Sequence, residues 1–233
     1  MRMRTGGKLL LVALATAVAG VLIGLYAWKL TYEAGSPAYT VPVKMVNGHP
    51  VVDLKIMTVA AIGPKLSENP DWVSYLVKTA TNGWQRETVW DVPANATVHV
   101  TDYNFDGDSG LRNPLYGRMF GVTAGGQKNA VYLDGKLVKV IDPDTASHVF
   151  AVNDLGIVVA FQGVPDDAKN QCGPVAPCPM SNAHTTTTFT FHTTKPGHYR
   201  WQCFVPCAAG WIDGWGGPMQ TIGYMDGFLN VEA

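Results

Sequence analysis

The chain has 233 residues, of which 47% are hydrophobic and only 15% are charged. This length suits one membrane segment and one domain of up to about 200 residues, and the 25 glycines and 15 prolines favour short strands and turns over long helices. Beyond residue 30, 13 Lys and Arg stand against 18 Asp and Glu, and this net charge of −5 argues against nucleic acid as a partner. The acidic balance suits a basic soluble partner, although solubility alone would also explain it.

The first predicted element is an apolar helix. Residues Leu9–Trp28 contain no charge, and about 20 apolar residues in a helix span the roughly 30 Å core of a bilayer. Three cations precede this run: Arg2, Arg4 and Lys8. The positive-inside rule therefore places the N-terminus in the cytoplasm and residues 31–233 on the outer side of the cell or inner membrane. A single-pass membrane protein is expected.

A cleavable signal peptide is the alternative for this segment. Ala17-Val18-Ala19 resembles a peptidase site after a short apolar stretch. The apolar run continues for nine residues beyond that site, which favours a retained anchor. Residues 1–30 are therefore expected to form a cytoplasmic tail and a transmembrane anchor.

The next 62 residues, 31–92, are expected to form a linker and an N-terminal extension. Gly, Ser and Pro interrupt any hydrophobic period in residues 31–50. Val51–Ala61 is apolar and rich in β-branched residues, which favours a strand. Asn69–Ala80 has the pattern of a short helix that begins at Pro70 and Asp71.

From residue 95 onward, strand signals recur at short intervals. The predicted strands are β-branched or aromatic, and turn residues such as Asp134-Gly135 and Pro196-Gly197 lie within or between them. They are Ala96–Phe105, Val131–Ile141, His148–Phe161, Thr185–Phe191, Tyr199–Cys203 and Tyr224–Val231. Short strands at this spacing predict a β-sandwich or a barrel in residues 93–233.

The cysteines allow a simple structural interpretation. There are four of them: Cys172, Cys178, Cys203 and Cys207. An even number in an oxidising compartment predicts two disulfides, with three possible pairings.

The segment Pro196-Gly197-x-Tyr199-x-x-x-Cys203-x-x-x-Cys207, together with His148 at the start of a strand, resembles subunit II of the haem-copper terminal oxidases. That family carries an extracytoplasmic cupredoxin domain tethered by one or two transmembrane helices. The resemblance covers roughly residues 95–233 and the anchor. It implies an all-β, cupredoxin-like Greek-key β-sandwich in residues 93–233, with one N-terminal transmembrane helix.

The resemblance also implies copper ligands. In the family two bridging thiolates hold two coppers that share one electron, and each copper takes one histidine and one weak axial donor. Carried over to this chain, the ligands are the side chains of His148, Cys203, Cys207 and Met225 and the backbone carbonyl of Val205. Soft sulfur and imidazole ligands favour copper over hard cations. Copper is the expected cofactor, and no cofactor is expected if Cys203 and Cys207 form a disulfide.

The sequence departs from the family pattern after Cys207. Trp211 stands where the family has its second histidine, and no histidine follows His198. Gly214 stands where the family has its methionine. The resemblance therefore leaves the second imidazole unassigned, and Asp213 is a possible substitute for it.

An insertion of about eleven residues, WIDGWGGPMQT, lengthens this loop and makes Met219 an alternative axial donor to Met225.

A mononuclear blue-copper site requires two histidines and one cysteine, and only His148 is well placed for such a site. The remaining histidines considered are expected at the surface: His99, His184, His192 and His198. The sequence has no Gly-rich phosphate loop, no Ser-His-Asp order and no paired carboxylates that would predict a catalytic centre.

The first functional interpretation is a non-catalytic or electron-relay subunit of an oxidase, whose helix packs against the haem-carrying catalytic subunit. With copper, its outer domain relays electrons from a soluble donor. Without copper, the complex takes electrons from quinol in the membrane and the domain is structural. The alternative is a free-standing, membrane-tethered copper protein for electron transfer or copper handling. A disulfide-stapled sandwich with an adhesive or scaffolding role is a third interpretation.

Overall fold

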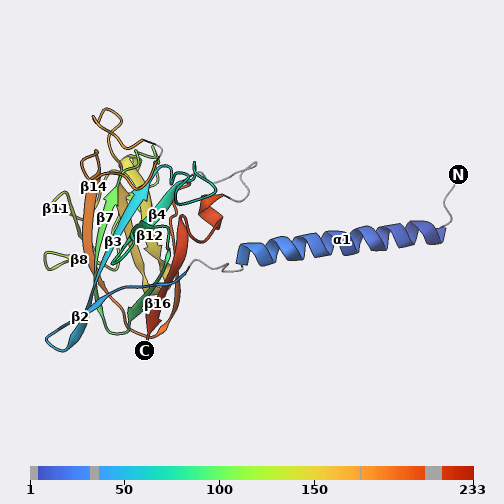
Figure 1. Cartoon of the computed structure of the whole chain (residues 1–233), viewed down its shortest axis with the longest axis horizontal. Helices are drawn as coiled ribbons and strands as arrows, with labels where there is room; N and C mark the ends of the chain where they lie inside the picture. The colour runs from blue at the N-terminus through green and yellow to red at the C-terminus, as the bar shows by residue number, and fades with distance from the viewer. Residues whose placement is uncertain (1–4, 32–36, 174, 208–216) are drawn as a thin grey trace. The chain divides into compact units, whose positions relative to one another are not determined.

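The computed structural model describes residues 5–31, 37–173, 175–207 and 217–233 (Figure 1). The chain forms two units, one from Met1 to Gly35 and one from Ser36 to Ala233. The first contains helix α1 (Thr5–Thr31), in which Gly6–Trp28 is long and apolar enough to cross a membrane, with a mean hydropathy of 2.5. A signal sequence can meet the same criterion, so the helix fits either an anchor or a signal.

The second unit is built from two β-sheets. The six-stranded sheet has the order β1 (Tyr39–Thr40), β6 (Val89–Pro93), β16 (Asp226–Glu232), β15 (Gly197–Gln202), β12 (Ala146–Val152) and β13 (Ile157–Gln162). The ten-stranded sheet runs β11 (Lys136–Val138), β10 (Val131–Leu133), β14 (Thr185–His192), β7 (Thr97–Asn104), β3 (His49–Val59), β4 (Ser74–Thr79) and β5 (Gly83–Gln85). Beside this path, β2 (Val43–Val46) pairs with β3, and β8 (Thr123–Ala124) pairs with β14 and with β9 (Gln127–Lys128). Four short 3₁₀ helices complete the described elements: η1 (Pro114–Gly117), η2 (Pro143–Thr145), η3 (Asn153–Leu155) and η4 (Pro218–Gln220).

The main core lies between the two sheets. Along β7 and β14, buried residues alternate with exposed or half-buried ones, as expected for strands that bury one face. From the six-stranded sheet, Trp90, Phe150 and Trp201 are fully buried against them. The all-β sandwich with one apolar N-terminal helix, expected from the sequence, is confirmed (Figure 1).

The strands predicted from residue 95 onward are present. Two of the predicted segments are hairpins rather than single strands: Val131–Ile141 contains β10 and β11, and His148–Phe161 contains most of β12 and β13. Asp134 and Gly135 have positive φ angles of 47° and 75° in the turn of the first hairpin. Such a two-residue turn favours Asp-Gly because both positions lie in the left-handed region.

Residues 37–92 are not a linker and extension, because 39–93 supply six strands to the two sheets. The helix predicted for Asn69–Ala80 is also wrong, since this stretch contains β4. Tyr75 and Val77 face the main core, while Leu76 packs into a second cluster on the other side of the strand. A strand buried on both faces lacks the alternation that identifies a half-buried strand, which explains the error.

The second cluster covers the opposite face of the ten-stranded sheet. Its buried members are Met57, Val59, Ile62, Leu76, Phe105, Ala176, Cys178 and Tyr224. The long loop before β14 joins this cluster through the disulfide Cys172–Cys178. Its disulfide packs in this second cluster, whereas Cys203 belongs to the main core.

Candidate metal centre

His148 lies at an irregularity in strand β12. The register between β12 and β13 shifts between Ala146 and His148, so that Ala146 pairs with Gln162 and His148 with Phe161. A bulge re-aims side chains, and here both Ser147 and His148 are buried. The imidazole of His148 is thereby directed into the protein, where it is fully buried.

The two cysteines lie in the loop that follows β15. The amide of Cys203 donates to the carbonyl of Met225 at 2.9 Å, and the amide of Cys207 donates to the carbonyl of Val205 at 2.7 Å. Strand β12 runs beside β15, and the amide of Val149 donates to Sγ of Cys203 at 3.3 Å. This pairing brings the loop against the strand that carries the histidine.

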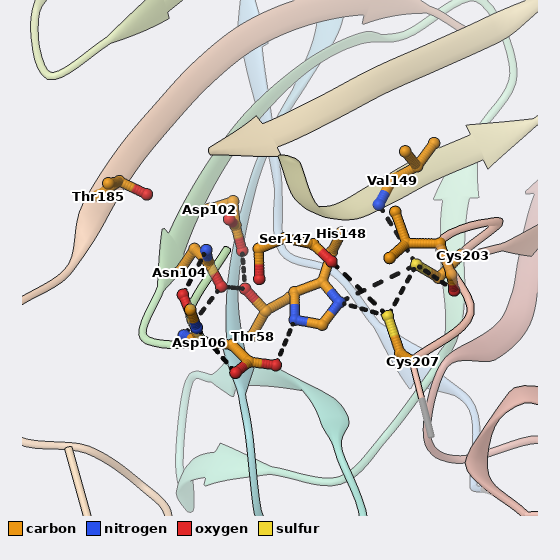
Figure 2. A network of polar contacts seen from close by, with 12 residues as sticks. Thr58, Asp102, Asn104, Asp106, Ser147, His148, Val149, Thr185, Cys203 and Cys207 are labelled. Carbon is orange, nitrogen blue, oxygen red and sulfur yellow. Dashed lines mark hydrogen bonds and ion pairs between the residues drawn. The ribbon is translucent and has the colours of Figure 1, made fainter. Parts of the chain in front are cut away.

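Three donor atoms meet at this point (Figure 2). Nδ1 of His148 is 3.0 Å from Sγ of Cys207 and 4.0 Å from Sγ of Cys203. The two sulfur atoms are 3.6 Å apart, well beyond a disulfide bond, and both cysteines are free. Cys203 is buried and Cys207 half-buried, so the site lies just beneath the surface.

A carboxylate completes the histidine's surroundings. Nε2 of His148 lies 3.1 Å from Oδ2 of Asp106, whose side chain is 27% exposed. Asp106 is fixed in turn: its amide donates to Oδ1 of Asn104 at 3.2 Å, and its Oδ1 accepts the amide of Gly107 at 2.8 Å. With Nε2 directed to the carboxylate, Nδ1 is the nitrogen that faces the sulfur atoms.

A buried polar network continues from Asp106 into the sandwich (Figure 2). Oγ1 of Thr58 donates to Oδ1 of Asn104 at 2.7 Å, and Nδ2 of Asn104 donates to the carbonyl of Gln162 at 2.8 Å. Asp102 lies beside Thr58, and burial raises its pKa well above the usual value. These contacts hold Asn104, and through it Asp106, in one orientation.

The imidazole, the carboxylate and the sulfur pair shift one another's pKa values. Burial lowers the pKa of His148, but Asp106 and Cys203 outweigh it and raise this pKa to about 10. Burial raises the pKa of Cys203, but the hydrogen bond from the thiol of Cys207 and the charge of the imidazolium outweigh burial and lower this pKa to about 5. The pKa of Cys207 is raised by the thiolate of Cys203 and by burial. The pair therefore carries one negative charge around neutral pH.

This charge distribution gives a first prediction. In protein stripped of metal by a chelator, the ultraviolet absorbance of one thiolate should rise with a midpoint near pH 5, because Cys203 ionises there. The variant Cys203→Ser should lose this transition. A single midpoint near the ordinary thiol value of about 8.5 would contradict the assignment.

A second prediction concerns Asp106. The substitution Asp106→Asn keeps the shape of the side chain but removes the charge that orients His148, and outer carboxylates of this kind typically contribute 10–100-fold to metal affinity. We expect about that loss in copper affinity, measured by competition with a chelator of known strength. Asp154→Asn, a change at an exposed position in the turn after β12, is the matched control and should leave the affinity unchanged.

The structure brings together part of the ligand set that the sequence predicted. His148, Cys203 and Cys207 converge, and the carbonyl of Val205 lies 3.7 Å from Sγ of Cys203. Met225 is fully buried and next to Cys203 through its backbone, while Met219 is partly buried against the same core. Both methionines remain predictions as axial donors. Trp211, Asp213 and Gly214 lie outside the described residues.

Sequence reasoning missed Asp106 and the bulge in β12. No local signal marks Asp106, because Asn104-Phe105-Asp106-Gly107 reads as an ordinary turn after a strand. Its role depends on β7 and β12 lying in facing sheets, which the sequence does not specify.

The donor set fits a copper ion. Ligands about 2.0–2.3 Å from one metal ion stand roughly 3–4 Å apart, and the three donor atoms lie 3.0, 3.6 and 4.0 Å from one another. Thiolate and imidazole ligands suit copper and zinc and disfavour hard cations. Within the described part of the chain the group contains one histidine, so it supplies one imidazole.

Comparisons with known proteins find similarity to solved structures only. No protein-family model matches the sequence, and no curated protein matches it. Among solved structures, rusticyanin from Thiobacillus ferrooxidans is 19% identical, with 91% of this chain and 93% of that chain covered and a TM-score of 0.33. A structure of reduced rusticyanin is 21% identical, covering 91% and 95%, with a TM-score of 0.34, and a further rusticyanin structure is described as a copper protein. The fold and the site assigned above rest on this chain's own strand pairing and donor atoms.

Proposed function

We propose that this chain is subunit II of a respiratory haem-copper terminal oxidase, and that its outer domain holds copper and relays electrons to the catalytic subunit. One observation carries the proposal: two unbonded cysteine sulfurs and one imidazole nitrogen converge beneath the surface of a β-sandwich. The motif that ends in Cys203-x-x-x-Cys207 gives the oxidase family as the context for that convergence.

In this proposal copper supplies one-electron exchange, and each residue has a separate task. Cys203 and Cys207 hold the ion by their sulfurs, with one of the two thiols ionised in the metal-free state. His148 binds through Nδ1, and Asp106 fixes its ring by the contact at Nε2. Val149 directs its amide to the sulfur of Cys203, which stabilises the thiolate. The surrounding apolar core excludes water from the buried sulfur.

The single apolar helix supports a membrane location for the complex. In the proposed arrangement its N-terminus is cytoplasmic, and the helix packs against the integral-membrane catalytic subunit. The outer domain then receives electrons from a soluble donor on the outer side. If the site were empty of copper in the cell, quinol in the membrane would be the donor instead.

The test is to purify the full tagged chain from its native membrane in mild detergent. The proposal predicts copper beyond that of the active site, together with haem from a co-purifying catalytic subunit, measured by elemental analysis and a haem absorption spectrum. Haem without the additional copper would support a quinol oxidase and overturn the relay role.

A free-standing, membrane-tethered copper protein is the alternative. The same donor set favours it equally, since three soft ligands bind copper whether or not a larger complex forms. Copper without any haem in the purified material would support this second function. Zinc in place of copper would overturn both.

A further inference from the structure

A groove on the sandwich is lined by three cations. Its lining residues lie between positions 114 and 143, whereas Cys203 and Cys207 follow β15. The groove has a volume of ≈ 410 Å³. Its charged residues are Arg118, Lys128 and Lys139, and its apolar residues include Met119, Phe120 and Val140. The three cations are about ten residues apart, at positions 118, 128 and 139, so the fold rather than direct adjacency in the sequence brings them to one groove.

Backbone pairing holds these segments together. Arg118 forms an isolated antiparallel bridge with Val140, which places it beside the segment that carries Lys139. Nζ of Lys139 donates to Oε1 of Gln127 at 3.3 Å, and Gln127 immediately precedes Lys128 in β9. The cluster is therefore a product of the fold rather than of mobile side chains that happen to approach.

The positive charge is concentrated and uncompensated. Residues 112–139 contain five of the 13 cations beyond the anchor and only one acid, Asp134, whereas the rest of the outer region has eight cations and 17 acids. Among the described residues none of the three groove cations forms an ion pair, and all three are exposed. Asp142, the nearest acid after Lys139, forms no ion pair with them either. Like charges gathered without counterions destabilise a fold unless a ligand neutralises them.

The groove also offers apolar surface. Val140 is 63% exposed, and Leu115, next to the lining residue Pro114, is 53% exposed. A site for a small inorganic anion would need cations and amides but no exposed aliphatic side chains. Cations around an exposed aliphatic surface fit a peptide that carries carboxylates and apolar side chains together.

We infer that this groove docks an acidic segment of a partner protein, whose carboxylates pair with Arg118, Lys128 and Lys139 and whose apolar side chain covers Val140. The acidic remainder of the domain repels such a partner everywhere else, so the groove fixes its orientation. The inference does not depend on copper, and its failure would leave the proposed function untouched.

The test uses the full chain in detergent and a fluorescently labelled twelve-residue peptide that alternates glutamate with leucine. We expect binding at low ionic strength that weakens as salt approaches about 0.15 M, because exposed ion pairs are screened there. Replacing all three groove cations (R118Q, K128Q and K139Q together) should weaken binding about tenfold, as three exposed pairs are lost. Copper-loaded and copper-free protein should bind equally.

A charge-matched variant separates the groove from net charge. The triple change K55Q, K65Q and K169Q removes three exposed lysines elsewhere and should alter binding less than twofold on the same scale. Equal losses in the two triple variants would overturn the inference. So would a peptide that fails to bind at low salt, or inorganic pyrophosphate that binds to the groove when the peptide does not.

Discussion

Replacing Cys203 by serine is expected to abolish stable copper binding. Sγ of Cys203 is buried, lies 3.6 Å from the sulfur of Cys207 and accepts the amide of Val149, so it is the thiolate of the pair. A serine hydroxyl at the same position is a hard, neutral donor that copper disfavours. The loss should exceed the 10–100-fold typical of residues that only orient a ligand. Copper retained after dialysis against a chelator, measured by elemental analysis, is the readout.

The disulfide-bonded pair of cysteines provides the matched control. Cys172 and Cys178 are bonded to each other and pack in the second cluster, so changing both to serine should leave copper retention unchanged. Equal copper retention in the Cys203→Ser variant and in the parent chain would contradict the ligand assignment. Loss of copper in the double variant as well would indicate a general folding defect, which circular dichroism of both proteins would reveal.

Substituting Trp201 by alanine is expected to lower the free energy of unfolding by about 3–5 kcal/mol. Trp201 is fully buried, stacks on Trp90 with ring centroids 4.8 Å apart and meets Tyr75 edge-on at 4.9 Å. Its Nε1 also donates to the carbonyl of Thr88 at 3.0 Å. In the alanine variant the carbonyl of Thr88 still accepts a hydrogen bond from the amide of Phe228, so it is not left unpaired. The loss of stability therefore comes mainly from the cavity that the missing ring leaves. Because a domain of this kind has about 5–15 kcal/mol in total, this loss is a large part of its stability.

Chemical denaturation of the full chain in detergent, followed by circular dichroism, measures this loss. Trp201→Phe keeps an aromatic ring in the core and should cost clearly less than the alanine change. Leu137→Ala, at a side chain that is 44% exposed, should change the free energy of unfolding by less than about 0.5 kcal/mol. A Trp201→Ala variant within about 1 kcal/mol of the parent would show that the aromatic cluster is not central to the core.

Much of the fold was predictable from local pattern. β14 alternates buried threonines and phenylalanines with more exposed threonines, and Asp134-Gly135 has the residues that a tight hairpin requires. Strand β4 was not predictable in the same way. It is buried on both faces, by the main core and by the second cluster, and only the tertiary structure shows that two layers cover it.

The candidate site also has a part that the sequence predicts and a part that depends on tertiary structure. Cys203, Cys207 and His148 were predicted as ligands because the motif around them resembles that of the oxidase family. Asp106 was missed because its importance comes from a contact between facing sheets, at 3.1 Å from the imidazole. The basic groove was missed for a related reason: its cations are spaced about ten residues apart in one segment, and the pairing of Arg118 with Val140 brings Arg118 beside Lys139.

X-ray absorption at the copper edge of the purified, copper-loaded chain examines the ligands themselves. Two sulfur neighbours and one imidazole nitrogen around the copper are the expected result. A copper bound only by nitrogen and oxygen would mean that the sulfurs of Cys203 and Cys207 serve some other purpose, and the metal centre described here would be wrong.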